Sequence, residues 1–531
     1  MIYDCSRKQV EKYWNRHAIT LGNEHVTYEE LEAESNRLAG KLIETGLKPG
    51  DRVGLFMEKT PKTIITIVGI SKAGGVYVPL DFRSPPERVA KIIHSSKPIL
   101  LFVDDHSIHH YQDVLSVDSY VNHIPWVWMS DKPIVFSDDK PPEFSYADIK
   151  SQLNIPHSVT RDENAAAQIL FTSGSTGEPK GVVITHKNIQ SFISWAVPFF
   201  KMEAGDRVSC HSLLHFDLST FDIFGAFASG SCLYLLPPEI NVNPKKLANF
   251  ILENKLTQWF SVPSALSYLA KFNAIPVGGF PKLKRLIWCG EVFPIKALQY
   301  WMKNLPDVQF TNLYGPTEAT IASSYHIVHE TPGDLSEIPI GTACSGEKLL
   351  VLNEELSFTS FNEVGNLYIA GSGLSPGYWQ DDEKTNTAFI NYTNQVGQEE
   401  RIYKTGDLAT LGEDGMVYFK GRSDYQIKSR GYRIELGEIE VALGQNEELK
   451  EFAVVPVKKN GFEGTAIGCA YVGEGMKNGD LTIHLKKKLL DKIPSYMIPH
   501  FWQAYEVQLP RNGNGKIDRR KLADEFENEN S

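Results

Sequence analysis

The chain has 531 residues, 42% hydrophobic and 22% charged, which is the composition of an ordinary globular protein with about three or four domains or subdomains. This excludes a chain that is disordered, collagenous or coiled coil as a whole. With 54 Lys and Arg against 65 Asp and Glu, the formal net charge is −11, so we expect neither nucleic acid nor a membrane as a partner. The six cysteines show no CxxC pair and no signal peptide is visible, which favours a cytoplasmic protein.

Helical and extended patterns alternate over the first hundred or so residues. Apolar spacing predicts a helix over 28–43, a strand over 51–56, a helix over 63–73 that ends at Gly74, and a strand over 76–79. A helix from Pro86 and a strand over 99–103 follow. Repeated strand–helix units imply a mostly parallel sheet covered by helices. The segment 129–162 is rich in Pro, Ser and Asp, and we expect it to loop over the surface.

Strand–helix units return at Ala165 and continue to about Ile340. Between Leu349 and Phe419, short strands separated by Gly and Asn predict a β-rich subdomain. The remainder predicts an α+β unit with a strand over 451–456, a helix over 481–492 and a polar tail, 524–531, that frays. The predicted fold class is therefore α/β, with a large N-terminal domain of βα-layered subdomains plus a β-rich subdomain, followed by a small α+β C-terminal domain.

The first chemical signal is the glycine- and hydroxyl-rich loop LFTSGSTGEPKG at 170–181. The exposed backbone N–H groups of such a loop bind phosphate oxygens, and its hydroxyls and Lys180 add further donors. The loop is not a Walker A motif, because Pro179 precedes the lysine and Gly181 follows it. A Ser/Gly-rich loop alone is more often a solvated turn, so the specificity lies in the whole string.

That string resembles the phosphate loop of the adenylate-forming superfamily, which includes acyl-CoA synthetases, luciferases and the adenylation domains of nonribosomal peptide synthetases. Five further stretches resemble the family's motifs in the family's order, at 72–81, 312–320, 403–408, 421–440 and 510–518. The resemblance covers nearly the whole chain. On these six motifs the chain is identified as a member of this superfamily, in the form of a free-standing amino-acid adenylation enzyme of the nonribosomal peptide synthetase type.

The resemblance implies ATP and Mg²⁺ as cofactors. Adenylation joins a carboxylate to the α-phosphorus of ATP and expels pyrophosphate, so positive charge is needed where negative charge accumulates. The resemblance assigns this role to Lys516, and it assigns Mg²⁺ and catalysis to Thr176 and Glu318. Asp407 corresponds to the ribose-binding carboxylate and Tyr314 to the ring that stacks on adenine. The predicted nucleotide-binding residues are Thr172, Ser173, Gly174, Ser175, Thr176, Gly177, Lys180, Gly290, Glu291, Val292, Asn312, Leu313, Tyr314, Gly315, Thr317, Asp407, Arg422 and Lys428.

Asp424 corresponds to the family's hinge. The resemblance implies an adenylation core over 1–423 and a mobile C-terminal domain over 424–531 that swings about Asp424 between two half-reactions. After the swing, Lys516 leaves the site and the face bearing residues 431–433 lines the thiol tunnel. No carrier domain follows Lys516, so we expect a separate peptidyl or acyl carrier protein, acting in trans, whose phosphopantetheine thiol accepts the aminoacyl group.

Asp217, within HFDLSTFD at 215–222, separates the branches of the family. A buried carboxylate needs a cationic partner, and the resemblance assigns Asp217 to the α-ammonium of an amino acid. The other implied wall residues are nearly all apolar, so we expect a small or medium neutral amino acid. The predicted substrate-binding residues are Phe216, Asp217, Leu218, Phe221, Ser261, Ile287, Cys289, Leu313, Ile321, Ala322 and Lys516.

The amino acid stays open, with proline slightly favoured over alanine, cysteine or a small aliphatic residue. The predicted function is ATP-dependent activation of this amino acid and its transfer to a carrier protein in natural-product biosynthesis. Two alternatives are a D-alanine–carrier-protein ligase and a CoA ligase for a small carboxylic acid, the second of which leaves Asp217 unpaired. A catalytically inactive nucleotide sensor is disfavoured, because Lys516, Asp407 and Glu318 are all present.

Overall fold

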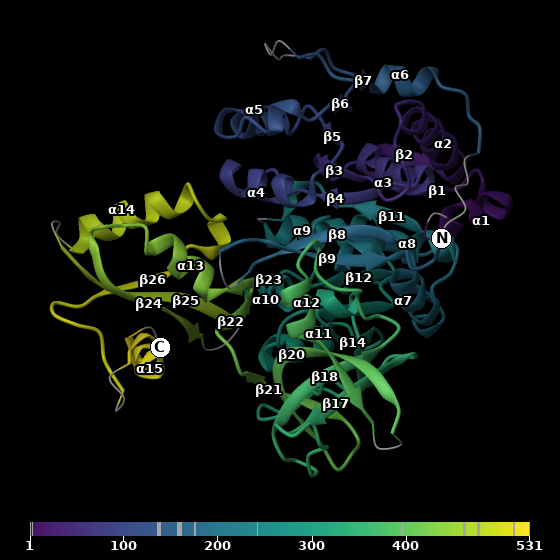
Figure 1. The fold of residues 1–531 in the computed structure, drawn as a ribbon. Coiled ribbons are helices and arrows are strands. Elements are labelled where there is room, and N and C mark those ends of the chain that lie inside the picture. The colour runs from purple at the N-terminus through teal and green to yellow at the C-terminus, as the bar shows by residue number, and fades with distance from the viewer. Residues whose placement is uncertain are drawn as a thin grey trace.

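The computed structural model describes residues 2, 4–134, 140–156, 162–174, 177–241, 243–394, 397–459, 464–474, 478–512 and 516–529 (Figure 1). Across these residues the strands form five sheets. Ser175 and Thr176, both predicted to bind nucleotide, lie outside the described residues. None of the helices in the described ranges is long and apolar enough to cross a membrane.

The first large sheet comes from the N-terminal third of the chain. Its order is β7 (Phe144–Ser145), β6 (Trp126–Trp128), β5 (Leu100–Val103), β3 (Arg52–Phe56), β4 (Val76–Pro79), β8 (Ala166–Thr172) and β9 (Lys180–Thr185). All neighbours pair in parallel except β8 and β9, which form an antiparallel hairpin. The predicted parallel sheet is confirmed, and the glycine-rich loop connects the two strands of the hairpin.

The second large sheet has nine strands. Its order is β16 (Thr342–Ala343), β15 (Ser324–Val328), β14 (Gln309–Tyr314), β13 (Arg285–Cys289), β12 (Gln258–Ser261), β10 (Arg207–Cys210), β11 (Cys232–Leu235), β1 (His17–Leu21) and β2 (Glu24–Thr27). The strands from β14 to β1 are parallel, and antiparallel strands flank them on both sides. The carboxyl ends of β10, β12, β13 and β14 therefore meet along one edge of the sheet.

Helices lie between the two sheets and on their outer faces. The core between the sheets contains α2 (Tyr28–Glu44), α3 (Pro61–Ala73), α7 (His186–Phe199) and α8 (Leu218–Ser229). The outer face of the seven-stranded sheet carries α4 (Pro86–Ser96) and α5 (Ile108–Val117), whereas α9 (Pro244–Glu253), α10 (Pro263–Lys271) and α11 (Ile295–Asn304) cover the nine-stranded sheet. Helices α3 and α8 are apolar on nearly every side because both sheets pack against them. Helix α1 (Asp4–Tyr13) packs on α2 and α8.

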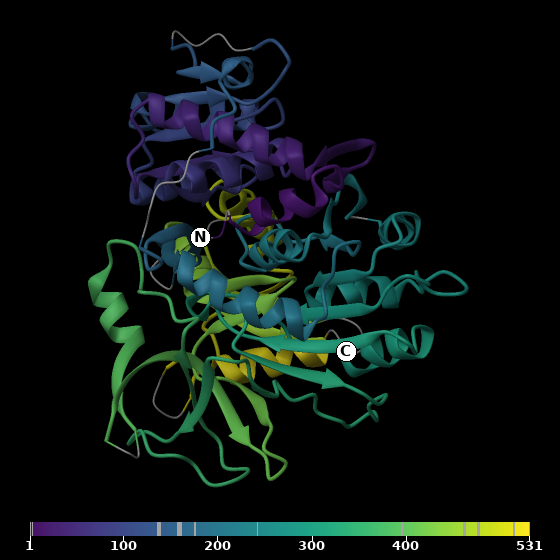
Figure 2. The ribbon, with the colours of Figure 1, turned by 90° about the vertical axis from the view of Figure 1, so that its right-hand side faces the viewer.

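The predicted β-rich subdomain is an antiparallel sheet at the bottom of both views (Figures 1 and 2). It contains β17 (Glu347–Leu352), β18 (Gly365–Gly371), β20 (Glu399–Leu411) and β19 (Phe389–Thr393), with β21 (Val417–Arg422) paired to β20. Helix α12 (Asp382–Ala388) leads into β19. The long strand β20 contains Asp407 and brings it toward the edge of the nine-stranded sheet. The five sheets and the helices that cover them confirm the predicted α/β fold class.

The elements after Asp424 form two further sheets beside the large body (Figure 1). Strands β22 (Gln426–Ser429) and β23 (Tyr432–Glu435) form a hairpin, and β24 (Leu449–Lys458), β25 (Thr465–Gly473) and β26 (Phe501–Ala504) form a three-stranded sheet. One face of this sheet packs on α13 (Leu436–Leu443) and α14 (Asn478–Leu490), the other on α15 (Arg519–Glu529). We call the described residues of 424–529 the C-terminal segment; the domain boundary at Asp424 stays a proposal.

Two local predictions were wrong. The segment 129–162 contains β7 and α6 (Tyr146–Ser151), because Phe144, Tyr146 and Ile149 are buried against the first core. The C-terminal tail is helical as far as Glu529, because Leu522 and Phe526 of α15 pack on the three-stranded sheet. In both places a few apolar residues in a polar stretch find a partner surface that is distant in sequence. Short turns of 3-10 helix complete the fold at Val121–His123, Pro238–Ile240, Thr317–Ala319 (η3) and Ser495–Met497 (η4).

Candidate active site

A cavity of about 1090 Å³ lies at the carboxyl ends of the parallel strands of the nine-stranded sheet. The loop after β10 contributes residues 211–213 and 215–217, and the turns after β12, β13 and β14 contribute Val262, Gly290 and Gly315. Strands β20 to β23 and the turn between β22 and β23 also line it, with Thr405, Asp407, Arg422, Gln426, Lys428, Arg430, Gly431, Tyr432 and Arg433. Clefts at the carboxyl ends of parallel strands are the usual ligand sites of α/β proteins, and this volume suits a ligand of nucleotide size.

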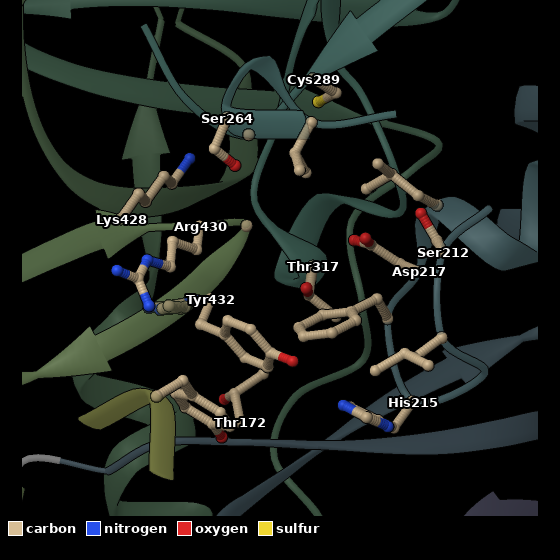
Figure 3. A pocket seen from close by; sticks show the side chains of 18 of the residues that line it. Thr172, Ser212, His215, Asp217, Ser264, Cys289, Thr317, Lys428, Arg430 and Tyr432 are labelled. Atoms are coloured by element: carbon tan, nitrogen blue, oxygen red, sulfur yellow. The ribbon is translucent and has the colours of Figure 1, made fainter. Parts of the chain in front are cut away.

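Asp217 lies at the start of α8, and its side chain points into the cavity (Figure 3). Burial raises the pKa of its carboxyl group to about 6, although a hydrogen bond with Thr317 and the positive charge of Lys428 lower it in part. Phe216, Leu218 and the thiol-bearing Cys289 line the cavity with it. A buried carboxyl group beside an apolar wall is a suitable partner for a ligand that carries one positive charge.

Asp407 and Tyr314 are brought together where the ribose and adenine were predicted to bind. The Tyr314 hydroxyl donates a hydrogen bond of 2.5 Å to Asp407 Oδ2, and Arg422 Nη1 lies 2.5 Å from Asp407 Oδ1. Lys428 Nζ lies 5.7 Å from the centre of the Tyr314 ring. Asp407, Arg422 and Lys428 line the cavity, whereas Tyr314 is 7% exposed and packs just behind them. Arg422 also pairs with Asp424 at 2.6 Å, which ties the predicted hinge residue to this cluster.

Glu318 is completely buried, and its carboxylate receives several donors. Arg433 Nη1 lies 2.6 Å from Oε2, the Tyr378 hydroxyl donates to Oε1 at 2.8 Å, and Lys180 Nζ lies 3.6 Å from Oε1. Burial opposes ionisation, but the charges of Arg433 and Lys180 hold the pKa of Glu318 well below its ordinary value. Both oxygens therefore already face protein donors in this arrangement. The magnesium site at Glu318 and Thr176 stays a prediction, and the described residues contain no group of three or more His, Cys, Asp or Glu placed to hold a metal.

The glycine-rich loop lies beside this carboxylate. The Ser173 hydroxyl donates a 2.6 Å hydrogen bond to the carbonyl oxygen of Arg433. A Cβ at Gly174 would lie 2.1 Å from the carbonyl oxygen of Glu178, so the turn requires glycine there. Burial, together with the charge of Arg433, lowers the pKa of Lys180 to about 8. Thr172 and Ser173 were both predicted to bind the nucleotide, and both line the cavity.

The C-terminal segment closes the cavity with residues 430–433. Gly431 N–H donates a 2.7 Å hydrogen bond to Glu291 Oε1, and the Tyr432 ring stands edge-on to Phe216 at 5.2 Å. Figure 3 shows Arg430 and Tyr432 on the side facing Asp217. Lys516, by contrast, is exposed and does not line this cavity. Residues 431–433 face the cavity and Lys516 does not, as expected for the state after a swing about Asp424, and the swing itself stays a proposal. The predicted contact of Lys516 with the substrates is not made in this structure.

Several other predicted residues lie behind the cavity wall or outside it. Val292 is 70% exposed. Glu291 accepts a hydrogen bond from Gly431, in the turn between β22 and β23, and Asn312 donates to the carbonyl oxygen of Pro339. Six predicted pocket residues are almost fully buried and do not line the cavity; these are Phe221, Ser261, Ile287, Leu313, Ile321 and Ala322. Of the predicted substrate-binding residues, Phe216, Asp217, Leu218 and Cys289 do line the cavity, whereas Phe221 packs against Phe192 and Phe260. Ala322 instead borders a separate void of about 10 Å³.

Some cavity residues were not predicted from the sequence. Ser264 and Tyr268 of α10, His215 of the loop after β10 and Tyr496 of η4 all line the cavity. His215 belongs to the stretch that contains Asp217, so its position along the chain was a usable signal. The other three carry no motif, and only the packing of α10 and of the C-terminal segment brings them to the cavity.

Comparison with known proteins agrees with this geometry. Residues 6–379 match the model of the AMP-binding enzyme family. The chain is 32% identical over 506 residues to a D-alanine–D-alanyl carrier protein ligase of Bacillus cereus, covering 94% of both chains. It is 33% identical over 510 residues to that of Staphylococcus epidermidis, covering 96% of this chain and 95% of the relative. These relatives are named for D-alanine, so the preference for proline is not supported.

Solved structures agree as well. The Vibrio cholerae adenylation domain AlmE, in complex with glycyl-adenosine-5′-phosphate, superposes with a TM-score of 0.86 at 25% identity and covers 99% of this chain and 97% of its own. A nonribosomal peptide synthetase protein with adenylation and carrier domains gives 0.79 at 25% identity, covering 98% of this chain and 83% of that one. Fold, cavity and motifs define an adenylate-forming enzyme that uses ATP. The chain belongs to the AMP-binding enzyme family, as an AMP-forming ligase.

Proposed function

We propose that this ligase activates D-alanine to D-alanyl-AMP and transfers it to the phosphopantetheine thiol of a carrier protein. The observation that carries the proposal is Asp217, a buried carboxyl group that faces a cavity also lined by Leu218 and Cys289. The curated relatives that share about a third of its residues along nearly the whole chain are D-alanine–D-alanyl carrier protein ligases. This replaces proline as the favoured substrate.

The size of the cavity at Asp217 supports a compact side chain. An α-ammonium paired with Asp217 directs the substrate's side chain toward Leu218 and Cys289. Beyond them, Phe221 is fully buried against Phe192 and Phe260, with ring centroids 5.3 and 5.6 Å apart. A larger side chain would have to displace this packing, and overpacking of a core commonly costs about 1–3 kcal/mol. A methyl group avoids that cost.

The chemistry of the first half-reaction follows from charge. The α-carboxylate of the substrate attacks the α-phosphorus of ATP, and pyrophosphate leaves. In the proposal, Asp217 orients the substrate, Asp407 and Arg422 hold the ribose, and Lys516 reaches the α-phosphate after the C-terminal segment turns. Mg²⁺, held at Glu318 and Thr176, would supply further positive charge. The thiol of the carrier protein then attacks the acyl carbon and AMP leaves, which forms the thioester.

Glycine is a second candidate, favoured by the structural similarity to AlmE, whose structure contains glycyl-adenosine-5′-phosphate. The two candidates differ by one methyl group beside Cys289. A hydrophobic pocket discriminates one methyl group by about 1–3 kcal/mol, or roughly 10- to 200-fold. The enzyme should therefore prefer one of the two clearly.

The test is ATP–pyrophosphate exchange with the purified chain and D-alanine, L-alanine, glycine or L-proline, with kcat/KM measured for each. We expect D-alanine to give the highest value and L-proline the lowest. Cys289→Ala is the matched variant, because it removes one sulfur atom from the wall, widens the cavity there and should improve a slightly larger substrate such as D-2-aminobutyrate relative to D-alanine.

If glycine gave the highest kcat/KM, glycine would replace D-alanine as the proposed substrate. Highest activity with L-proline or a larger residue would overturn the size argument. Exchange with acetate or propionate, but with no amino acid, would show that Asp217 does not bind an ammonium group and would favour a small-acid CoA ligase.

A further inference from the structure

A buried ion pair joins the C-terminal segment to helix α4, which covers the seven-stranded sheet. Arg88 of α4 donates from Nη1 to Glu438 Oε1 of α13, 350 residues further along the chain. The two side chains are only 9% and 2% exposed. Helix α4 otherwise packs on the outer face of its own sheet, so this pair links two parts of the chain that share no sheet.

The buried carboxylate of Glu438 is stabilised by this contact with Arg88. Its second oxygen, Oε2, is buried and accepts no hydrogen bond within the described part of the chain. A buried carboxylate that loses its cationic partner is strongly destabilised, because it has given up its hydration and receives nothing in exchange. The carboxylate of Glu438 is therefore stable in this buried position only while α13 lies against α4.

The C-terminal segment can present only one of its faces to the cavity. Glu438 lies on α13, which packs on one face of the three-stranded sheet, together with β22 and β23. Lys516 directly precedes Ile517, which packs on the opposite face with Leu522 and Phe526. A rotation that brings Lys516 into the cavity must turn α13 away from α4 and separate Arg88 from Glu438.

We propose that Glu438 is a positioning residue for thioester formation, and that its ion pair with Arg88 holds the C-terminal segment in the arrangement that lets the carrier thiol reach the acyl-adenylate. This rests on the proposed function in assigning the second half-reaction to this arrangement. Arg88 also lines the cavity, but the proposed role of the ion pair needs neither residue to touch the reacting atoms. The neighbouring stack of Tyr432 on Tyr496, with ring centroids 3.6 Å apart, orders the same face of the segment.

The test compares the two half-reactions in Glu438→Gln, Arg88→Met and the double charge reversal Arg88→Glu/Glu438→Arg. Glu438→Gln keeps the size of the side chain and removes its charge. We expect its amino-acid-dependent exchange to stay within about twofold, while single-turnover transfer to the carrier protein falls at least about tenfold. We expect Arg88→Met to slow transfer similarly, and the charge reversal to recover part of the loss.

A matched control is Arg285→Met. Arg285 pairs with Asp206 inside the nine-stranded sheet region, at 2.5 Å and with side chains 5% and 0% exposed. Its loss also removes a buried cation from a buried carboxylate, which keeps Lys284 at 3.1 Å as a second partner, but this pair does not join the C-terminal segment to the rest of the chain. We expect this variant to unfold at lower denaturant concentration and to keep the ratio of the two half-reactions.

Small-angle X-ray scattering of the substrate-free protein tests the arrangement without any assumption about the substrate. We expect Glu438→Gln and Arg88→Met to shift the distance distribution relative to wild type and Arg285→Met. An unchanged distribution in both variants, or equal loss of both half-reactions in the folded Glu438→Gln protein, would overturn the proposal. Absence of amino-acid-dependent exchange in the wild type overturns the proposed function instead, and scattering still decides the role of the ion pair.

Discussion

Replacing Asp217 with Asn removes one negative charge from the cavity and keeps the shape of the side chain. Burial raises the pKa of Asp217 from the ordinary 3.8 to about 6, which at about 1.4 kcal/mol per pH unit corresponds to a cost of roughly 3 kcal/mol for the ionised form. A substrate ammonium bound beside the carboxylate offsets this cost. In Asp217→Asn the ammonium enters a buried site without a counter-charge, and losing one partner of a buried pair costs about 3–5 kcal/mol. We therefore expect kcat/KM for the amino acid to fall roughly 100-fold or more.

The sign of the pH dependence follows from the same value. Below about pH 6 the empty cavity holds Asp217 protonated, so the wild-type KM for the amino acid should rise as the pH falls, approaching tenfold per pH unit. Asp217→Asn should lack this dependence. Because the folded-state pKa is raised, the empty protein should lose up to about 3 kcal/mol of stability from this group as the pH rises from about 4 to about 6.

The assay is ATP–pyrophosphate exchange between pH 5 and pH 8, with ATP binding measured separately by calorimetry as the control for folding. Asp407 and Arg422 remain intact in the variant, so we expect its affinity for ATP to stay near that of the wild type. A KM for the amino acid within about twofold of wild type at pH 8, where tenfold corresponds to about 1.4 kcal/mol, would refute the pairing of Asp217 with an ammonium group.

Two further predictions separate the half-reactions. Lys516→Ala should reduce ATP–pyrophosphate exchange by about 100-fold or more, as expected for loss of a charge that stabilises the transition state, yet spare transfer from preformed aminoacyl-AMP, because Lys516 is exposed and outside the cavity in the arrangement seen here. Equal loss of both activities in the folded variant would contradict this. Gly431→Leu should have the opposite effect, because φ is +82° at Gly431 and a Cβ there would lie 3.0 Å from Val262 Cγ1. Single-turnover transfer to the carrier protein should fall at least about tenfold while exchange stays within about twofold, and unchanged transfer would show that residues 430–433 need not close the cavity.

Local sequence patterns were sufficient for much of the fold. Helix α2 begins at Tyr28, directly after a capping box formed by Thr27 and Glu30, and α3 ends where Gly74 adopts a left-handed conformation with φ of 100°. Both signals act within four residues and are independent of the rest of the chain. The repeated strand–helix units likewise predicted parallel sheets, since each unit needs a crossover of similar length.

The candidate site was predictable in part for the same reason. Asp217 and Thr317 belong to motifs in the connections that follow two parallel strands, β10 and β14, so their convergence at one edge follows from a parallel arrangement. Asp407 was identified by its motif alone, because it lies on β20 of the antiparallel sheet. The depth of the cavity was not predictable. Phe221 and Ala322 stand at motif positions, but whether they reach the cavity depends on how Phe192, Phe200 and Phe260 fill the space around them. That is a packing property of side chains from α7 and the residue that caps it, α8 and β12.

The arrangement of the C-terminal segment was decided by tertiary structure alone. The sequence contains both Lys516 and the 431–433 face, and nothing local says which of them meets the cavity. In this structure the choice falls to contacts between residues far apart in the chain, Glu318 with Arg433, Glu291 with Gly431 and Arg88 with Glu438. Each is a charged or hydrogen-bonded group whose burial is favourable only when its distant partner is also present. The sequence by itself thus determined which groups the enzyme has, and the packing of distant elements determined which of them face the cavity.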